Sequence, residues 1–208
     1  MVPLINLEER RRKIEEGLSG SDTSSDEDQH YDTTSKKLSI RQLYQEYAKH
    51  QPHLLSTFNS RSFNIFTFEA PRQTQLPVLS LHLVHSHNLL HLLNEVQFAN
   101  FLALVTSTYR QSVQYHNDLH GFDVAHMAHL FLTQGNLKEL AELQEVDVLS
   151  LLVAALCHDL GHDGLTNGYH VNAMSQRAVR YSDVSVQENY HAAETFKLMQ
   201  REQFLNVT

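Results

Sequence analysis

Three short stretches of the sequence combine imidazole, carboxylate and amide side chains at spacings that suit metal ligation. They are residues 115–123 (YHNDLHGFD), 158–167 (HDLGHDGLTN) and 181–191 (YSDVSVQENYH). The chain holds 15 histidines in 208 residues, a high number for this length. Histidine is the side chain most often used as a metal ligand or proton carrier near neutral pH. The three stretches therefore indicate a metal site.

In the first stretch, helical spacing would place His116, His120 and Asp123 on one face, at positions i, i+4 and i+7. Apolar residues flank this polar line, so we expect it to face inward and to need partners. Taken by itself, the line is equally compatible with buried histidines that bond backbone carbonyls.

The second stretch follows the apolar segment 147–157 and places His158 and His162 four residues apart, with Asp159 beside the first. An ionised carboxylate at the end of a buried element is costly without a counter-charge, which a divalent cation supplies. Asn167 adds an amide nearby. Two elements that both present histidines at ligand spacing predict a metal centre.

In the third stretch, Glu188 and His191 stand three residues apart and share a helix face. We expect Ser182 or Asp183 to cap this helix at its start. A carboxylate and an imidazole so placed suit the orientation of metal-bound waters, although by themselves they are typical of surface residues.

The elements that must position these side chains are predicted to be helices. The apolar spacing predicts helices over residues 38–47, 78–93 and 94–109, and a helix buried on all sides over 147–157. Residues 63–68 fit a strand, a turn or a short helix. Few Gly and Pro residues and many helix formers complete an all-α prediction.

Residues 1–37 are mostly charged or polar and cannot bury a core, so we predict a disordered acidic and polar tail before a single domain at 38–208. Cys157 is the only cysteine, which excludes an intrachain disulfide and predicts a buried, inert thiol. No apolar run is long enough for a membrane span, and the charged start is unlike a signal peptide, so we expect a cytoplasmic chain. The net charge of -8 argues against a nucleic-acid partner.

Further histidines lie outside the three stretches. The group after Pro77 has no carboxylate among its members, and we expect these histidines to be solvated or to pack: His82, His85, His87 and His91. His126 and His129 continue the face begun by His116, and we expect them to have packing or supporting roles.

The order of the motifs resembles a known family. Tyr-His-Asn-x-x-His-x-x-Asp-Val, His-Asp-x-x-His-x-Gly-x-x-Asn and Tyr-x-Asp-x-Ser-Val-x-Glu-Asn-x-His resemble the catalytic domain of class I 3′,5′-cyclic nucleotide phosphodiesterases, all-helical members of the His-Asp (HD) superfamily. The resemblance covers roughly 38–208 and is most specific over 115–199. It implies metal-dependent hydrolysis of cyclic AMP, cyclic GMP or both to 5′-monophosphates in cyclic-nucleotide signalling.

The resemblance also implies a role for each matching residue. His116 matches the general acid that protonates the departing 3′ oxygen, and Tyr115 lines the nucleotide pocket. The other matches hold two divalent cations, usually Zn²⁺ at the first site and Mg²⁺ or Mn²⁺ at the second, with Asp159 bridging them. The first-site ligands are His120, His158 and Asp159. The residues around the waters of the second cation are His162, Asn167, Glu188 and His191.

Two residues depart from the family pattern: Asp163 replaces Pro or Thr, and Tyr190 replaces His. We expect Asp163 to face solvent, with closer cation binding as the alternative. A further downstream Asp ligand, the purine-binding Gln and an aromatic clamp have no match here. We therefore expect a catalytic domain truncated before its C-terminal helices, with one side of the apolar domain uncovered.

Two alternatives stay open. The chain is either this hydrolase, with a small-molecule cyclic nucleotide as its partner, or a weak or inactive homologue that acts as a regulatory or interaction module, as a homo- or hetero-oligomer. A His-Asp hydrolase acting on another phosphate substrate is disfavoured, because the Tyr-His-Asn element carries the general acid of this family.

Overall fold

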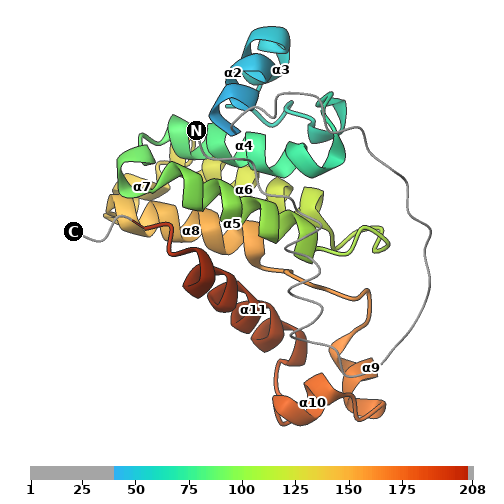
Figure 1. Ribbon diagram of the computed structural model, residues 1–208. Coiled ribbons are helices and arrows are strands. Elements are labelled where there is room, and N and C mark those ends of the chain that lie inside the picture. Colours follow the sequence, from blue (N-terminus) through green and yellow to red (C-terminus); the bar gives the residue numbers. More distant parts are fainter. Residues whose placement is uncertain (1–39, 206–208) are drawn as a thin grey trace.

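The computed structural model describes residues 40–205, so the tail predicted at 1–37 lies outside the described residues (Figure 1). Over the described range the chain is helical and holds no β-strand, only one isolated antiparallel bridge between Leu93 and Leu205. The all-α prediction is confirmed. None of the described helices is both long and apolar enough to cross a membrane.

Ten α-helices and two 3-10 helices follow one another along residues 40–205. In chain order they are α2 (Ile40–His50), α3 (Pro52–Ser56), η1 (Ile65–Thr67), α4 (Arg72–Ser86), η2 (Leu90–Leu92), α5 (Glu95–Thr108), α6 (Asp118–Thr133), α7 (Leu137–Leu140), α8 (Glu145–Cys157), α9 (Asn167–Asn172), α10 (Gln176–Arg180) and α11 (Val186–Glu202).

The long helices form a central bundle, with shorter helices at its two ends. In Figure 1, α4, α5, α6 and α8 lie alongside one another, with α2 and α3 above them and α11 slanting below towards α9 and α10. Helix α6 packs along α8, α4 packs against α5 and α6, and α11 packs against α5. Buried Leu, Val and Phe side chains from these helices form one continuous core.

The close approach of α6 to α8 depends on a glycine. A Cβ added at Gly121 would lie 2.8 Å from the carbonyl oxygen of Leu156 and 2.8 Å from the hydroxyl of Tyr109. That same hydroxyl donates a 2.9 Å hydrogen bond to the Leu156 carbonyl. Because His120 and His158 stand beside this contact in sequence, the contact sets how closely their two helices bring them together.

Side chains at the start of α6 hold its first turn. The Asn117 side chain accepts hydrogen bonds from the backbone N–H groups of Leu119 and His120, as expected of a helix N-cap. Asp118 is fully buried and pairs with Arg72 at 2.5 Å. An ion pair whose carboxylate is removed from solvent ties the start of α4 to the start of α6.

The helix predicted at 78–93 has different bounds. Helix α4 begins at Arg72, contains Pro77 and ends at Ser86, before Asn88 turns the chain with a φ of 58°. Proline lacks its own N–H bond and crowds the carbonyl one turn earlier, and the burial of the side chains on either side of Pro77 offsets these costs and keeps that turn helical. The helix predicted at 94–109 is present as α5, and residues 63–68 take the short-helix alternative, as η1.

The apolar segment 147–157 forms α8, but the expectation that it is buried on all sides is wrong. Leu152 and Leu156 are almost fully buried, whereas Asp147, Ser150 and Ala154 are exposed. The reason is that α6 covers one side of the helix, while the opposite side lines an open groove towards α11.

Candidate metal centre

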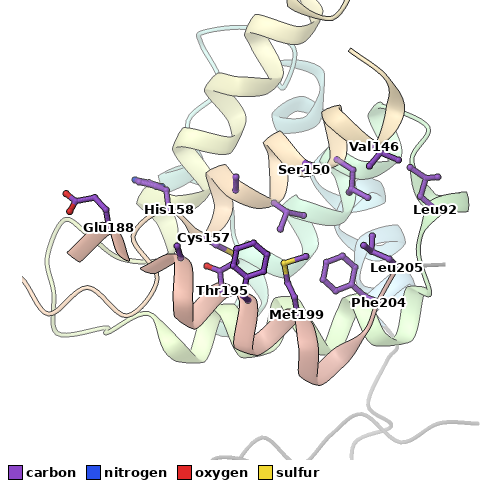
Figure 2. A pocket seen from close by; sticks show the side chains of 15 residues that line it. Leu92, Val146, Ser150, Cys157, His158, Glu188, Thr195, Met199, Phe204 and Leu205 are labelled. Carbon is purple, nitrogen blue, oxygen red and sulfur yellow. The ribbon is translucent and has the colours of Figure 1, made fainter. Parts of the chain in front are cut away.

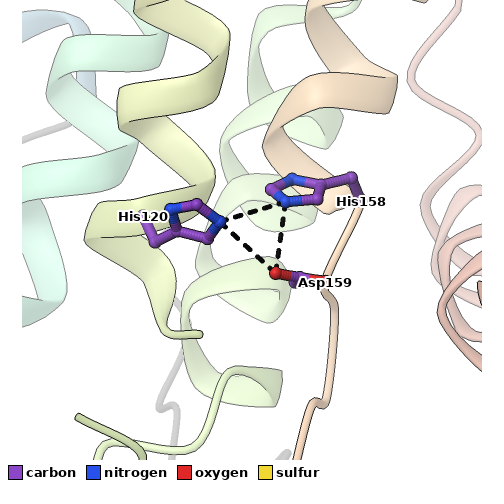
Figure 3. Close-up of side chains that lie close together, drawn as sticks. All are labelled: His120, His158 and Asp159. Atoms are coloured by element: carbon purple, nitrogen blue, oxygen red, sulfur yellow. Dashed lines mark hydrogen bonds and ion pairs between the residues drawn. The ribbon is translucent and has the colours of Figure 1, made fainter. Parts of the chain in front are cut away.

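His120, His158 and Asp159 converge from two helices on one point (Figure 3). His120 comes from the first turn of α6, and the other two follow the last residue of α8. Asp159 Oδ2 lies 3.4 Å from His120 Nε2 and 3.2 Å from His158 Nε2, and the two nitrogens are 3.2 Å apart. A tetrahedron of ligands about 2.0–2.1 Å from Zn²⁺ has edges of about 3.3 Å, so the three atoms fit a shared cation.

Hydrogen bonding prepares His158 for ligation. Its Nδ1 lies 2.9 Å from the carbonyl oxygen of Ala155, to which it can only donate, so Nε2 is the nitrogen that faces Asp159. This Nε2 donates to the carboxylate when the ring is protonated and offers its lone pair to a cation when the ring is neutral. Burial opposes the ionisation of Asp159, but the hydrogen bond and charge of His158 outweigh it and lower the Asp159 pKa to about 2. The hydrogen bond to Asp159 in turn raises the pKa of His158. The carboxylate is therefore ionised at neutral pH.

A second group shares the same carboxylate. Asp159, His162 and His191 place one ligand atom each within 4.8 Å of one another. His191 Nε2 lies 3.8 Å from Asp159 Oδ1, so the two oxygens of Asp159 face different groups. His191 Nδ1 lies 2.8 Å from the Leu160 carbonyl, which fixes the proton there, and the buried Nε2 has no hydrogen-bond partner. An unpartnered lone pair aimed at a carboxylate fits a cation between them.

His162 is oriented differently from the other histidines of these two groups. The backbone N–H of Gly164 donates to His162 Nδ1 at 2.9 Å, so a neutral ring carries its proton on Nε2. Such a ring donates to a water or a phosphate oxygen instead of ligating a cation directly. Its ring stacks on that of His116, with centroids 4.1 Å apart.

Asn167 and Glu188 form a pair beside the second group. The Asn167 side-chain amide donates to both carboxylate oxygens of Glu188, at 3.2 and 3.0 Å, and accepts from the Gln187 backbone N–H at 2.8 Å. Backbone hydrogen bonding and the Asn167 amide lower the pKa of Glu188. The exposed carboxylate is thus held in a set orientation while ionised.

The predicted polar line of the first stretch is not a helix face. His116 precedes the N-cap of α6, Asp123 is exposed, and only His120 points into the site from the helix. The i, i+4 reading failed because Asn117 begins the helix after His116. Tyr115 is 65% exposed, with its ring 4.5 Å from that of His120, so it borders the site from the solvent side.

Two other expectations are wrong. Asp163 does not face solvent, since its carboxylate pairs with Arg177 at 3.2 Å and accepts from Gln187 at 3.0 Å. Neither Ser182 nor Asp183 caps α11, because both adopt positive φ in the preceding turn and Ser185 stands at the N-cap without a side-chain hydrogen bond.

Several residues that build the site carry no signal in the motifs. Arg177 and Gln187 reach the segment after α8 from α10 and α11, and Arg72 reaches Asp118 from α4. Each lies 10 or more residues from its partner along the chain. Sequence spacing therefore could not have revealed these pairs.

Eight of the described histidines fall into two sets. We call His120, His158, His162 and His191 the metal-facing histidines, and we call His82, His87, His126 and His129 the packing histidines. In the second set, His126 Nε2 bonds the Phe58 carbonyl at 2.6 Å and His129 bonds both His87 and Asn59. This agrees with the packing role expected for His87, His126 and His129.

A groove of about 770 Å³ runs between α8 and α11 beside the first group (Figure 2). His158 and Glu188 lie at one end, and Leu92, Phe204 and Leu205 lie towards the other. Its walls are mainly apolar. Cys157 is 2% exposed at its base, and burial raises its pKa to about 12, in agreement with the inert thiol predicted.

The chain is similar in sequence to several known proteins. Residues 115–208 match the family model of the 3′5′-cyclic nucleotide phosphodiesterases. The chain is 40% identical over 99 residues to the 3′,5′-cyclic-nucleotide phosphodiesterase regA of Dictyostelium discoideum, covering 48% of the chain and 12% of that relative. It is 33% identical over 168 residues to the human high affinity cGMP-specific 3′,5′-cyclic phosphodiesterase 9A, covering 79% and 27%.

A third relative is the human dual specificity calcium/calmodulin-dependent 3′,5′-cyclic nucleotide phosphodiesterase 1B, 33% identical over 153 residues, with 70% of the chain and 28% of the relative covered. The matched part of the chain thus spans at most 28% of the length of these three relatives. The matched region includes all three motif stretches.

Proposed function

We propose that residues 115–208, which match the family model of the 3′5′-cyclic nucleotide phosphodiesterases, are part of a class I catalytic domain of this family, and that the chain provides the metal centre for hydrolysis of cyclic nucleotides to 5′-monophosphates. The observation that carries the proposal is the position of Asp159. One carboxylate faces two groups of histidines with its two oxygens, as a ligand shared by two cations must.

In this proposal His120, His158 and Asp159 hold the first cation, for which Zn²⁺ suits the donor set. Asp159 and His191 border the second, where we propose Mg²⁺ or Mn²⁺. An imidazole donor favours Mn²⁺ over Mg²⁺, which prefers oxygen ligands. When bound, two such cations make water a better nucleophile and neutralise the charge that grows on the phosphoryl oxygens.

Other residues of the chain then orient the waters and the nucleotide and protonate the departing 3′ oxygen. We assign to His116 the proton that the departing 3′ oxygen receives, because its ring is held against His162 at the rim of the site. His162 donates from Nε2 to a water or a phosphate oxygen. Asn167 and Glu188 orient waters on the second cation's side, and the exposed Tyr115 ring forms a wall for the nucleotide.

The test is hydrolysis of cyclic AMP and cyclic GMP by the purified chain, before and after removal of cations with a chelator. We expect 5′-monophosphate to form, the reaction to stop on chelation and Zn²⁺ with Mn²⁺ to restore it. Product from both substrates at rates equal to those of a His116→Gln, Asp159→Asn double variant would contradict the proposal.

The open groove favours a second candidate function. It is large, mainly apolar and continuous with His158 and Glu188, features typical of surfaces that bind another chain. A regulatory or interaction module would use this face while the centre keeps its cations. Stoichiometric zinc in a purified chain that turns over neither cyclic nucleotide would favour the module over the hydrolase.

A further inference from the structure

Four residues outside the candidate ligand set form one connected group behind the second cation group. Asp163 lies in the segment after α8, Arg177 in α10, and Gln187 and Tyr190 in the first turns of α11. We call these four residues the Arg177 clamp. In sequence, Asp163 follows His162, Gln187 precedes Glu188, and Tyr190 precedes His191.

Arg177 contacts the other three members at once. Its Nη1 lies 3.2 Å from Asp163 Oδ2 and donates to Gln187 Oε1 at 2.7 Å, while Nη2 donates to the Gly161 carbonyl at 3.3 Å. The guanidinium lies over the Tyr190 ring, 3.6 Å from its centroid, as in a cation–π contact. One side chain thus joins the turn that carries Asp159 and His162 to the helix that carries His191.

Gln187 completes the connection. Its side-chain amide donates to Asp163 Oδ1 at 3.0 Å and to the Leu165 carbonyl at 2.9 Å, and its backbone N–H donates to Asn167. Gln187 is only 4% exposed and every one of these polar groups has a partner. A buried network in which each group is bonded has one geometry, because any shift leaves a polar group without a partner.

The Tyr190 ring closes the clamp against the backbone. A Cβ added at Gly161, whose φ is +73°, would lie 3.1 Å from this ring. The turn therefore rests on the ring with no room for a side chain between them. Because the Arg177 guanidinium also lies on this ring, Tyr190 limits how closely the turn can approach α11.

We propose that the Arg177 clamp positions the second cation group, by fixing the separation between the turn that carries Asp159 and His162 and the helix that carries His191. The first group depends on it only through Asp159, because His120 and His158 are positioned by the contact of α6 with α8 at Gly121. The clamp residues are positioning residues, and this role rests on the proposed function for the identity of the second cation.

The test is a titration of the full chain with Mn²⁺, followed by electron paramagnetic resonance, after Zn²⁺ has been loaded at the first group. Arg177→Met keeps the length of the side chain and removes its charge and donors. We expect Mn²⁺ affinity at the second group to fall about 10- to 100-fold, the usual effect of losing a residue that orients ligands. The Zn²⁺ affinity of the first group should change less than about threefold.

Arg180→Met is the matched control, because Arg180 lies on the same helix and is exposed. It should bind Mn²⁺ like the unmodified chain. Arg177→Lys restores the charge without the planar donor group, so we expect affinity between those of the unmodified chain and Arg177→Met. If Arg177→Met does not fold, Asp163→Asn and Arg177→Lys carry the same test.

Equal Mn²⁺ affinities in the Arg177 and Arg180 variants would overturn the clamp, as would equal loss of Zn²⁺ and Mn²⁺ from a folded Arg177 variant. Equal Mn²⁺ affinities together with intact cyclic-nucleotide hydrolysis would leave the proposed function standing. Selective loss of Mn²⁺ in a chain that hydrolyses no cyclic nucleotide would support the clamp and overturn that function. An unmodified chain that binds one cation only would overturn both.

Discussion

The metal-facing and packing histidines differ in what surrounds them. Three of the metal-facing rings, those of His120, His158 and His191, present Nε2 to Asp159. Among the packing rings, those of His82, His126 and His129 lie against Phe58. The hydrogen bonds of this set go to a backbone carbonyl, an amide, the Tyr44 hydroxyl and each other. Within the described residues, a carboxylate shared by several rings marks the site, and histidine content by itself does not.

Electrostatics distinguishes His158 from the packing histidines. Burial lowers the pKa of His82 to about 4 and, with the charge of His87, that of His129 to about 3, so both rings are neutral in the folded protein. His158 has its pKa raised by the hydrogen bond to Asp159 instead, whereas burial lowers the pKa of His120, His162 and His191 as it does in the packing set. Rings that stay neutral in the core contribute packing and hydrogen bonds, whereas rings beside an ionised carboxylate offer a cation a site that is already negative.

The largest expected effect comes from Asp159→Asn, which removes the charge that distinguishes the two sets. Both cation groups lose their shared ligand, so we expect bound metal to fall from two cations to none. Any cyclic-nucleotide hydrolysis should fall about 10³-fold or more, since metal charge stabilisation is worth several kcal/mol. Metal analysis after dialysis and a turnover assay measure these effects. Asp123→Asn, at an exposed position on α6, is the control and should change neither.

His116→Gln tests a histidine that borders the site without facing Asp159 directly. If it supplies a proton, hydrolysis should fall about 10²-fold or more while both cations remain bound. A substrate with a leaving group that needs no protonation should recover much of the loss. Loss of metal from this variant would instead assign His116 to ligation.

His129→Ala tests the packing set. It leaves His87 and Asn59 without their partner and removes a buried ring, so we expect the free energy of unfolding to fall by about 1–3 kcal/mol. Urea unfolding measures the change, with His53→Ala as the exposed control. Metal content should be unchanged, and a loss of bound zinc would contradict the separation of the two sets.

The smallest expected effect is a dependence of stability on pH. Because the folded-state pKa values of His82 and His129 lie below the ordinary value of 6.5, the unfolded chain binds more protons once the pH falls below about 6.5. Their contribution to stability is complete above that value and is lost progressively towards pH 4 and 3. Urea midpoints of the metal-free chain between pH 7.5 and 5 should fall.

A combined His82→Gln, His129→Gln variant should show a shallower decline over the same interval. An identical slope would mean that other groups cause the acid sensitivity. The metal-free state is needed because loss of cations at low pH would add its own slope.

The ligand candidates were accessible from sequence, whereas their positioning was not. His120, His158 and Asp159 were predicted together, and the structure brings them within 3.4 Å of one another. Asp163 was expected in solvent, because nothing near it in the sequence shows that Arg177 reaches it from another helix. Helix limits were misjudged at Pro77, where the burial of neighbouring residues outweighs the local preference of proline.

The sequence by itself determined the residue types, their order and the helical class, because helix periodicity and the cost of burying charge act over a few residues. Only the tertiary structure decided that Asp159 divides its oxygens between two groups, that carbonyls fix the protons of His158 and His191, and that an arginine from α10 braces the turn between them. These features depend on distances between residues far apart in the chain. Such distances follow from how helices pack, which at Gly121 is a matter of a single missing Cβ.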